Sequence, residues 1–111
     1  MPPTEELGLL QGTLDLLILK TLAWGPRHGY AIARWIKDTS DEALTIEDRA
    51  LYLALHRLEE RDLVESVWGL SENNRRAKYY QLTTAGRTQL RLESSVWREY
   101  ATAVFKVLEI A

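Results

Sequence analysis

Residues 71–86 of the chain, SENNRRAKYYQLTTAG, decide how the rest of the sequence is interpreted. Three basic residues, Arg75, Arg76 and Lys78, follow two asparagines and run directly into two tyrosines. The 111-residue chain has a net charge of -2, but residues 71–92 hold five basic residues against one acidic residue. This segment therefore carries +4 and leaves -6 for the remainder, and such segregated charge steers charged ligands whatever the total.

The basic segment lies in a predicted β-hairpin. Residues 63–68 (LVESVW) and 78–82 (KYYQL) are short and rich in Val or aromatic residues, as strands are. The polar stretch between them includes Asn73 and Asn74, which tolerate turn geometry. We therefore expect two strands joined by a long tip, with the basic residues at the tip and on the outgoing strand.

Three helices are predicted before the hairpin. Residues 7–22 are apolar on more than one side, which indicates a helix that packs against a partner helix, and Gly25-Pro26 ends it. Residues 28–37 predict a second, short helix, and a short strand is expected at Leu44-Thr45. For the third helix, Thr45 and Asp48 resemble a capping box. The buried side of this helix is predicted to hold Leu51, Leu55 and Leu58.

A last helix, residues 85–108, is predicted to begin after Thr83 or Thr84. The order predicts a mainly α fold with a small β-hairpin (α+β): a winged helix-turn-helix plus a C-terminal dimerisation helix. We expect residues 1–84 to form a winged-helix DNA-binding domain. Residues 85–111 would form the dimerisation helix, as one compact unit with the first helix.

The outward side of the third helix is the predicted reader of DNA bases. Arg49 can donate to guanine, Leu53 can contact a thymine methyl group, and His56 can donate to a base or a phosphate. Tyr52 can reach a phosphate. The candidate contacts on this helix are Arg49, Ala50, Tyr52, Leu53, His56 and Arg57.

The hairpin, or wing, is predicted to bind the phosphate backbone, because each cation that neutralises a phosphate releases a counterion. Asn side chains add hydrogen bonds to phosphates or base edges. The candidate wing contacts are Asn73, Asn74, Arg75, Arg76 and Lys78. At the start of the second helix, the candidates are His28 and Tyr30.

The four tryptophans have different predicted places. Trp24, Trp35 and Trp68 are expected in or near the core. Trp97 lies on an apolar stripe with near-heptad spacing, which predicts a second helix against it. Two facing indoles in a dimer can stack or sandwich a flat aromatic ligand. The predicted effector and dimer-interface residues are Leu10, Leu14, Trp97, Tyr100, Ala101, Val104 and Leu108.

Other functions lack their residues in this sequence. The chain has no cysteine, and its two histidines have no ligand set at metal-binding spacing, so neither metal nor cofactor is expected. No nucleophile-base pair or phosphate-binding glycine motif indicates an enzyme. No apolar run reaches the roughly 18 to 20 residues of a membrane span, and the N-terminus is polar and acidic. We expect a cytoplasmic protein.

These residues together resemble the PadR family of bacterial transcriptional regulators. The resemblance rests on HGY at residues 28–30, LYLALHRLE at residues 51–59, RRAKYY at residues 75–80 and LTTAG at residues 82–86. The single helix after the wing is similar to the compact subfamily. The resemblance implies a homodimeric repressor, joined through its first and last helices, that binds a pseudo-palindromic operator. Many members release DNA when a small aromatic or lipophilic compound binds, and some carry a tryptophan that Trp97 matches.

Three residues depart from the family's pattern, which usually has Gly at Arg49, Pro at Leu53 and Gly at Asp62. Two of them lie on the reading face, so base contacts cannot be copied from relatives. Asp62 follows the third helix, where its Cβ and its charge at the negative end of the helix dipole cost about 1 kcal/mol.

Two other functions fit the same pattern of elements. A winged-helix protein-interaction module without operator binding is favoured by the net acidity and by the acidic residues of the third helix. An RNA-binding winged helix would need an exposed aromatic platform, and none is predicted.

Overall fold

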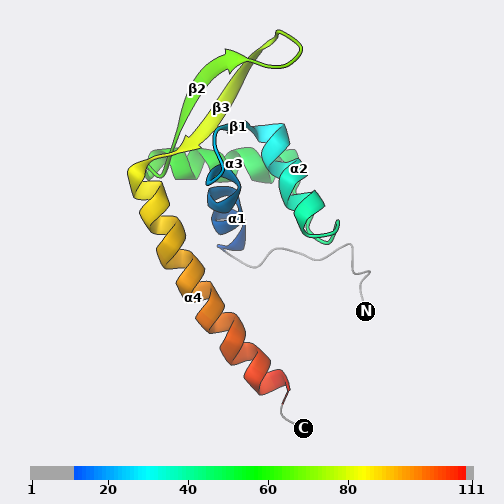
Figure 1. Ribbon diagram of the computed structural model, residues 1–111, viewed down its shortest axis with the longest axis vertical. Helices are drawn as coiled ribbons and strands as arrows, with labels where there is room; N and C mark the ends of the chain where they lie inside the picture. Colours follow the sequence, from blue (N-terminus) through cyan, green and yellow to red (C-terminus); the bar gives the residue numbers. More distant parts are fainter. Residues whose placement is uncertain (1–11, 110–111) are drawn as a thin grey trace.

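The computed structural model describes residues 12–109, and its order of elements confirms the predicted fold class. The helices are α1 (Thr13–Leu22), α2 (Gly29–Thr39), α3 (Asp48–Glu60) and α4 (Thr84–Leu108). The strands are β1 (Arg27–His28), β2 (Val64–Leu70) and β3 (Arg76–Leu82). They form an antiparallel sheet in the order β1-β3-β2 (Figure 1). Leu10 lies outside the described residues, as does the first part of the predicted helix 7–22.

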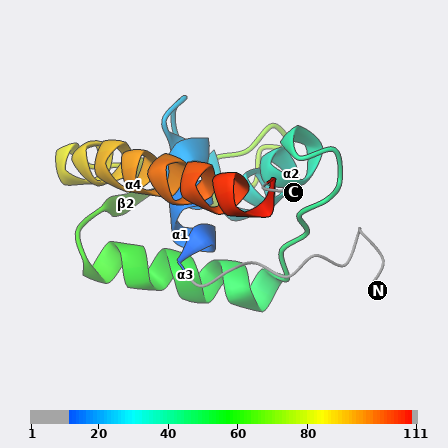
Figure 2. The ribbon, with the colours of Figure 1, turned by 90° about the horizontal axis from the view of Figure 1, so that it is seen from below.

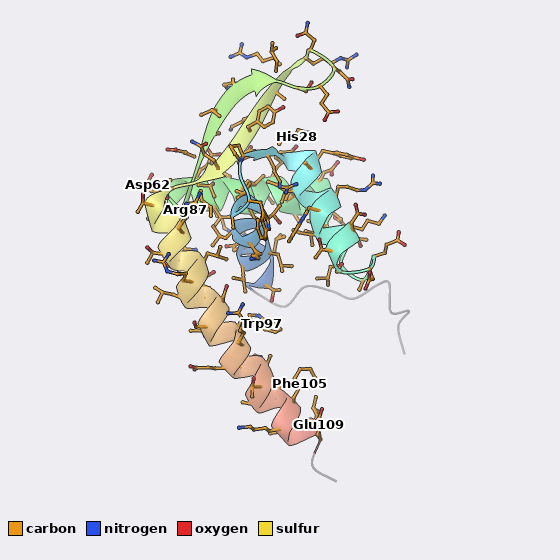
Figure 3. The ribbon with its side chains drawn as sticks, in the orientation of Figure 1. His28, Asp62, Arg87, Trp97, Phe105 and Glu109 are labelled. Atoms are coloured by element: carbon orange, nitrogen blue, oxygen red, sulfur yellow. The ribbon has the colours of Figure 1, made fainter. Side chains whose placement is uncertain are left out.

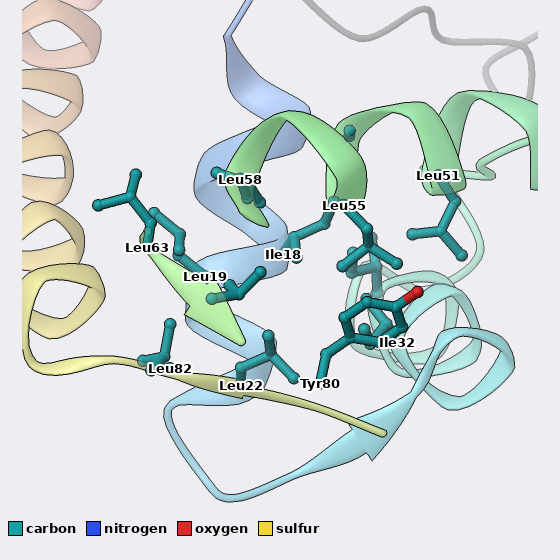
Figure 4. Close-up of a cluster of buried hydrophobic side chains, with 13 residues drawn as sticks. Ile18, Leu19, Leu22, Ile32, Leu51, Leu55, Leu58, Leu63, Tyr80 and Leu82 are labelled. Atoms are coloured by element: carbon teal, nitrogen blue, oxygen red, sulfur yellow. The ribbon is translucent and has the colours of Figure 1, made fainter. Parts of the chain in front are cut away.

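Helix α1 occupies the centre of the molecule. Ile18, Leu19 and Leu22 are at most 1% exposed, and α1 contacts α2, α3, α4 and β3. Figure 4 shows these side chains enclosed by Leu55 and Leu58 of α3 and by residues of the sheet. The apolar excess of this helix is therefore largely absorbed by its own chain, whereas the sequence indicated a partner helix for it.

The start of α3 differs from the prediction. Its N-cap is Glu47 rather than Thr45, and no side chain caps it, so the predicted capping box is wrong. The strand expected at Leu44-Thr45 is also absent, because this segment is a connection in which Leu44 N–H donates to Ser40 Oγ at 3.0 Å. Strand β1 is absent from the sequence-based prediction, and it pairs through two residues with Tyr79 and Tyr80 of β3.

Two of the expected core tryptophans lie on the surface. Trp24 is 68% exposed in the turn after α1, with Lys20 Nζ 5.0 Å from its ring centroid. Trp68 is 59% exposed on β2. Only Trp35 packs against the core as predicted. Both exposed rings lie beside a cation, Lys20 for Trp24 and Arg76 for Trp68, which adds a weak cation–π attraction.

The wing is longer than predicted, because each strand extends two residues further towards the tip. The tip itself is closed by hydrogen bonds from Ser71 N–H to the Arg75 carbonyl at 2.8 Å and from Asn74 N–H to the Ser71 carbonyl at 2.9 Å. Asn74 adopts φ +58°, a left-handed conformation that asparagine tolerates. Arg76 consequently lies on β3 rather than on the tip, and Lys78 lies on β3 as predicted.

The end of α3 and the start of α4 meet at one junction. Leu63 N–H donates to the Leu58 carbonyl and Asp62 N–H to the Glu59 carbonyl, each at 3.0 Å, which is the Schellman arrangement. Asp62 takes the left-handed position of this motif, with φ +58°. Thr83 Oγ donates to the Asp62 carbonyl at 2.6 Å, so the next helix begins against the end of the last.

The same threonine is the N-cap of α4, which confirms the first of the two predicted candidates, Thr83 and Thr84. Thr83 Oγ accepts from Gly86 N–H at 3.0 Å, and Thr83 N–H donates to the Leu63 carbonyl at 3.1 Å. A Cβ on Gly86 would overlap the Leu63 carbonyl oxygen. Position 86 therefore has to be glycine for α3 and α4 to approach as they do.

Beyond its contacts with α1, α4 runs away from the other elements, and the molecule measures 56 × 32 × 21 Å (Figures 1 and 2). Figure 3 shows Trp97, Phe105 and Glu109 on this extended part of the helix. None of the described helices combines the length and the apolar character that crossing a membrane requires.

Replacing Asp62 by glycine tests the strain in the Schellman motif. Asp62→Gly should raise the free energy of unfolding by about 0.5–1 kcal/mol, because glycine adopts a positive φ without steric cost and removes a carboxylate from the end of α3. The melting temperature, measured at fixed protein concentration, should rise by a few degrees without loss of DNA binding. Asp62→Ala is the control, since it removes the charge but keeps Cβ. An unchanged or lower midpoint for the glycine variant would contradict this account.

Candidate nucleic-acid interface

The outward side of α3 is open to solvent along its length. Arg49, Leu53 and His56 are exposed, and Leu53 keeps 51% of its surface accessible. Ala50 is exposed too. The opposite side is fixed in the core by the residues Leu51, Ala54, Leu55 and Leu58, all at most 1% exposed. The predicted reading residues thus lie on a helix whose orientation the core sets.

Two of the basic residues of α3 have acidic partners. Arg57 Nη2 lies 2.9 Å from Asp15 Oδ1, which ties the C-terminal half of α3 to α1. His56 Nε2 lies 3.4 Å from Glu60 Oε1, a pair that is ionic only when the histidine is protonated. Three basic residues of α3, Arg49, His56 and Arg57, are predicted to contact DNA. Among residues 12–109, Arg49 is the one of these three that forms no ion pair.

A shallow hollow of about 340 Å³ lies between α2, α3 and the wing. It brings together candidates from all three predicted groups, including His28, Tyr30, Tyr52 and Lys78. Tyr52 is 48% exposed, and its ring crosses above Gly29, where a Cβ would come 2.5 Å from its hydroxyl oxygen. The absence of a side chain at Gly29 is what allows α2 and α3 to share this hollow.

His28 has a structural task at the start of α2. Its Nδ1 accepts a hydrogen bond from Ala31 N–H at 3.2 Å, which caps the helix. In the neutral ring the proton consequently resides on Nε2. The ring stacks on Tyr30 at 6.3 Å and meets Tyr79 edge-on at 5.7 Å. Tyr30, 66% exposed, stands at the rim of the hollow.

A wider depression of about 620 Å³ separates α2 from the wing tip, between the residues of α2 and Ser71, Glu72 and Asn73. Arg34 lies in its wall. Hydrogen bonds to Tyr30 and Asp38 raise the pKa of Arg34 further above its usual value. This guanidinium is therefore a positive charge near the tip, and it forms an exposed ion pair with Asp38 at 3.2 Å.

Lys78 is held at the base of the wing. Its Nζ lies 3.5 Å from Glu59 Oε1, and Ser66 Oγ donates to Glu59 Oε2 at 3.1 Å. The same ammonium group stands 5.3 Å from the centroid of the Tyr80 ring. Burial raises the pKa of the Tyr80 hydroxyl, while Lys78 opposes that shift. Lys78 thus joins the wing to α3 as well as adding charge.

Arg75 and Arg76 are the two basic residues of the wing that have no ion-pair partner among residues 12–109. Both are exposed, as are Asn73 and Asn74 beside them. Two unpaired guanidinium groups next to an open helix face can bind consecutive phosphates of a nucleic-acid backbone. Within the described residues no three His, Cys, Asp or Glu side chains gather as a metal site would need.

Of the predicted effector residues, Trp97 lines a separate groove of about 310 Å³ between α1 and α4, whereas Leu14 packs against the core. Leu16, Leu92, Val96 and Trp97 line it. Trp97 is 39% exposed, and Tyr100 meets its ring edge-on at 6.4 Å. Within this chain the groove is an open surface rather than an enclosed cavity.

One side of the wing, which includes Trp68, is absent from the predicted site. Alternation along β2 puts Val64, Ser66, Trp68 and Leu70 on one side of the sheet. Of these four residues only Val64 is buried, so Trp68 lies on the exposed outer part of the wing, which the strand pattern alone does not distinguish from a core position.

Comparison with known proteins identifies relatives over most of the chain. The Transcriptional regulator PadR-like family matches residues 18–92. A PadR family transcription regulator from Clostridium difficile has 29% identity and a TM-score of 0.77, over 87% of this chain and 99% of its own. One from Eggerthella lenta has 33% identity and a TM-score of 0.75, over 91% and 86%. An uncharacterized protein of Lysinibacillus sphaericus is 29% identical over 82% of this chain and 84% of its own.

A three-helix unit followed by a hairpin whose free cations adjoin an open helix defines a winged-helix DNA-binding protein. Its function is the regulation of transcription rather than catalysis. The chain belongs to the PadR-like family of transcriptional regulators. Regulators of this family bind DNA and commonly dimerise.

The contact between Tyr52 and Gly29 predicts that Gly29→Ala destabilises the protein when Tyr52 is present and stabilises it when the Tyr52 ring is removed. Gly29→Ala should lower the free energy of unfolding by about 1–3 kcal/mol, because the new Cβ overlaps the Tyr52 ring. With Tyr52→Ala already present, the same substitution should stabilise by about 0.5–1 kcal/mol, since alanine is the better helix former. Chemical denaturation of the four proteins gives both values. A destabilisation of equal size in both backgrounds would show that Tyr52 is not the obstacle.

Proposed function

We propose that the protein is a homodimeric repressor that binds a pseudo-palindromic operator through two copies of α3 and two wings. The observation that carries the proposal is the pairing of an open α3 face with the two unpaired wing arginines, Arg75 and Arg76, on a common rigid base. In a two-fold dimer the two α3 helices would enter successive major grooves about 34 Å apart.

The proposed contacts divide into base reading and backbone binding. Arg49, Leu53 and His56 would read base edges, with Tyr52 and Ala50 beside them. Wing residues would bind phosphates, as would His28 Nε2 and the Tyr30 hydroxyl at the rim of the hollow. Because Arg57 and Lys78 already bind carboxylates of the same chain, their part is mainly to supply charge and to hold α3 and the wing in position.

The proposed dimer interface is α4 together with α1. Large apolar side chains along α4 are left exposed, which a monomer of this size would rarely tolerate. They are Leu92, Val96, Trp97, Tyr100, Val104, Phe105, Val107 and Leu108. This pattern supports the division into a DNA-binding domain, residues 1–84, and a dimerisation helix, residues 85–111. The proposed interface also includes Leu10, Leu14 and Ala101.

We place a regulatory ligand of the repressor in the groove beside Trp97. A second copy of α4 would cover this open groove and add a second indole, which makes a site for a flat aromatic or lipophilic compound. Such a ligand would release DNA by favouring a half-site separation that one turn of duplex does not match.

The wing arginines give the first test of DNA binding. Arg75→Ala and Arg76→Ala should each weaken binding by a similar factor for all sequences and reduce the slope of log K against log salt by about 0.9. Arg49→Ala should instead change which duplexes are selected from a random pool. Binding of the wild type and variants is measured by fluorescence anisotropy over a range of salt. No binding of the wild type at low salt would favour the protein-interaction module instead.

The dimer is tested by truncating its aromatic anchor. Wild-type protein should have the mass of two chains at micromolar concentration in sedimentation equilibrium, and Trp97→Ala should weaken association by about tenfold or more, because a large buried side chain is lost. Trp24→Ala is the matched control, since that tryptophan is exposed and lies outside α4. A wild-type protein that sediments as a single chain would contradict the proposed dimer.

A further inference from the structure

Trp68 lies on the side of the wing that faces α3. Val64 and Leu82, the paired residues at the base of the hairpin, are buried in the core. Side chains alternate along a strand, so Ser66 and Trp68 follow Val64 on that same face. Ser66 confirms the direction, because its hydroxyl reaches Glu59 of α3.

The face carries two cation–aromatic pairs, one above the other. At the base, Lys78 stands over Tyr80, and its charge is balanced by Glu59 at 3.5 Å. Further out, the Arg76 guanidinium carbon lies 4.6 Å from the centroid of the Trp68 ring. The register explains the upper pair, because Trp68 is opposite Lys78 and Arg76 is its diagonal neighbour.

The two pairs differ in what their cations can still do. Lys78 has a carboxylate partner, whereas Arg76 has none among residues 12–109. A guanidinium held over an indole ring still has N–H groups to donate, and it loses fewer side-chain conformations when a phosphate binds. An arginine without the ring would sample many conformations on a solvent-exposed strand.

We propose that Trp68 is a positioning residue for DNA binding, which holds the Arg76 guanidinium on the α3 side of the wing where it binds a phosphate of the duplex read by α3. The inference rests on the proposed role of the wing arginines. Trp68 would act through Arg76, because Arg76 gives this face the unpaired positive charge that a phosphate requires and the indole itself carries none.

The test is a double-mutant cycle on the full chain with a mixed-sequence 30-base-pair duplex as the probe. Trp68→Ala should weaken binding about two- to fivefold, the value of an exposed cation–π contact. In the Arg76→Ala background, Trp68→Ala should cause no further loss. Trp68→Phe keeps an aromatic face and should restore most of the affinity. Circular dichroism and the melting temperature verify folding, and substitution of Trp68 should leave the fold intact because the side chain is 59% exposed.

Trp24→Ala is the matched control, because Trp24 is also exposed and also pairs with a cation, Lys20. The turn that carries it projects on the side of the molecule opposite α3 (Figure 2), so its loss should leave DNA affinity unchanged. An equal loss on Trp68→Ala with and without Arg76 would overturn the proposal, as would no loss at all while Arg76→Ala still weakens binding. If Arg76→Ala itself has no effect, the assignment of the wing to the DNA backbone fails first.

Discussion

The arrangement of this protein depends on two hydrogen bonds made by the backbone of Leu63. Its N–H closes the end of α3 on the Leu58 carbonyl, and its carbonyl accepts from Thr83 N–H at the start of α4. Gly86 leaves room for that carbonyl, because any Cβ there would occupy the same space. One residue therefore closes the end of the third helix, directly precedes the first long strand of the wing and sets where the last helix starts. The angles between the reading helix, the wing and α4 are consequently fixed together rather than one by one.

This common fixation matters because DNA binding requires all three elements at once. Arg57 and Lys78 reinforce it from either flank of α3, the first by binding Asp15 of α1 and the second by binding Glu59 below the wing. Neither pair is worth much for stability at such exposure, since solvent screens it. Their effect is better understood as geometric: they use two of the basic side chains near the interface to hold elements in place, and they leave Arg49, Arg75 and Arg76 unpaired among the described residues.

The sequence predicted the order of the elements and the buried side of α3, because period-3.6 and period-2 patterns are local and strong in this chain. It did not predict β1, since two residues hold no periodicity and the strand exists only through its partners on β3. The Thr45 cap failed because a helix can begin one or two residues later whenever packing sets its position. Apolar character alone predicts a core position for Trp24 and Trp68. Each ring is instead exposed and lies beside a cation, Lys20 or Arg76, that the folded structure brings near. Ion pairs such as Arg57–Asp15, 42 residues apart, leave no local pattern.

The charge of the molecule gives the last element of the mechanism. With +4 in residues 71–92 and -6 elsewhere, the chain as a whole repels a polyanion while the wing and the start of α4 attract it. Such a distribution disfavours encounters through the wrong face and orients the approach through the right one. It also limits non-specific affinity, because few phosphates can be neutralised at a time. A regulator built this way must obtain much of its binding from the few cations that are held in a productive orientation, which is why the stacking of Arg76 on Trp68 has more consequence here than it would in a strongly basic protein.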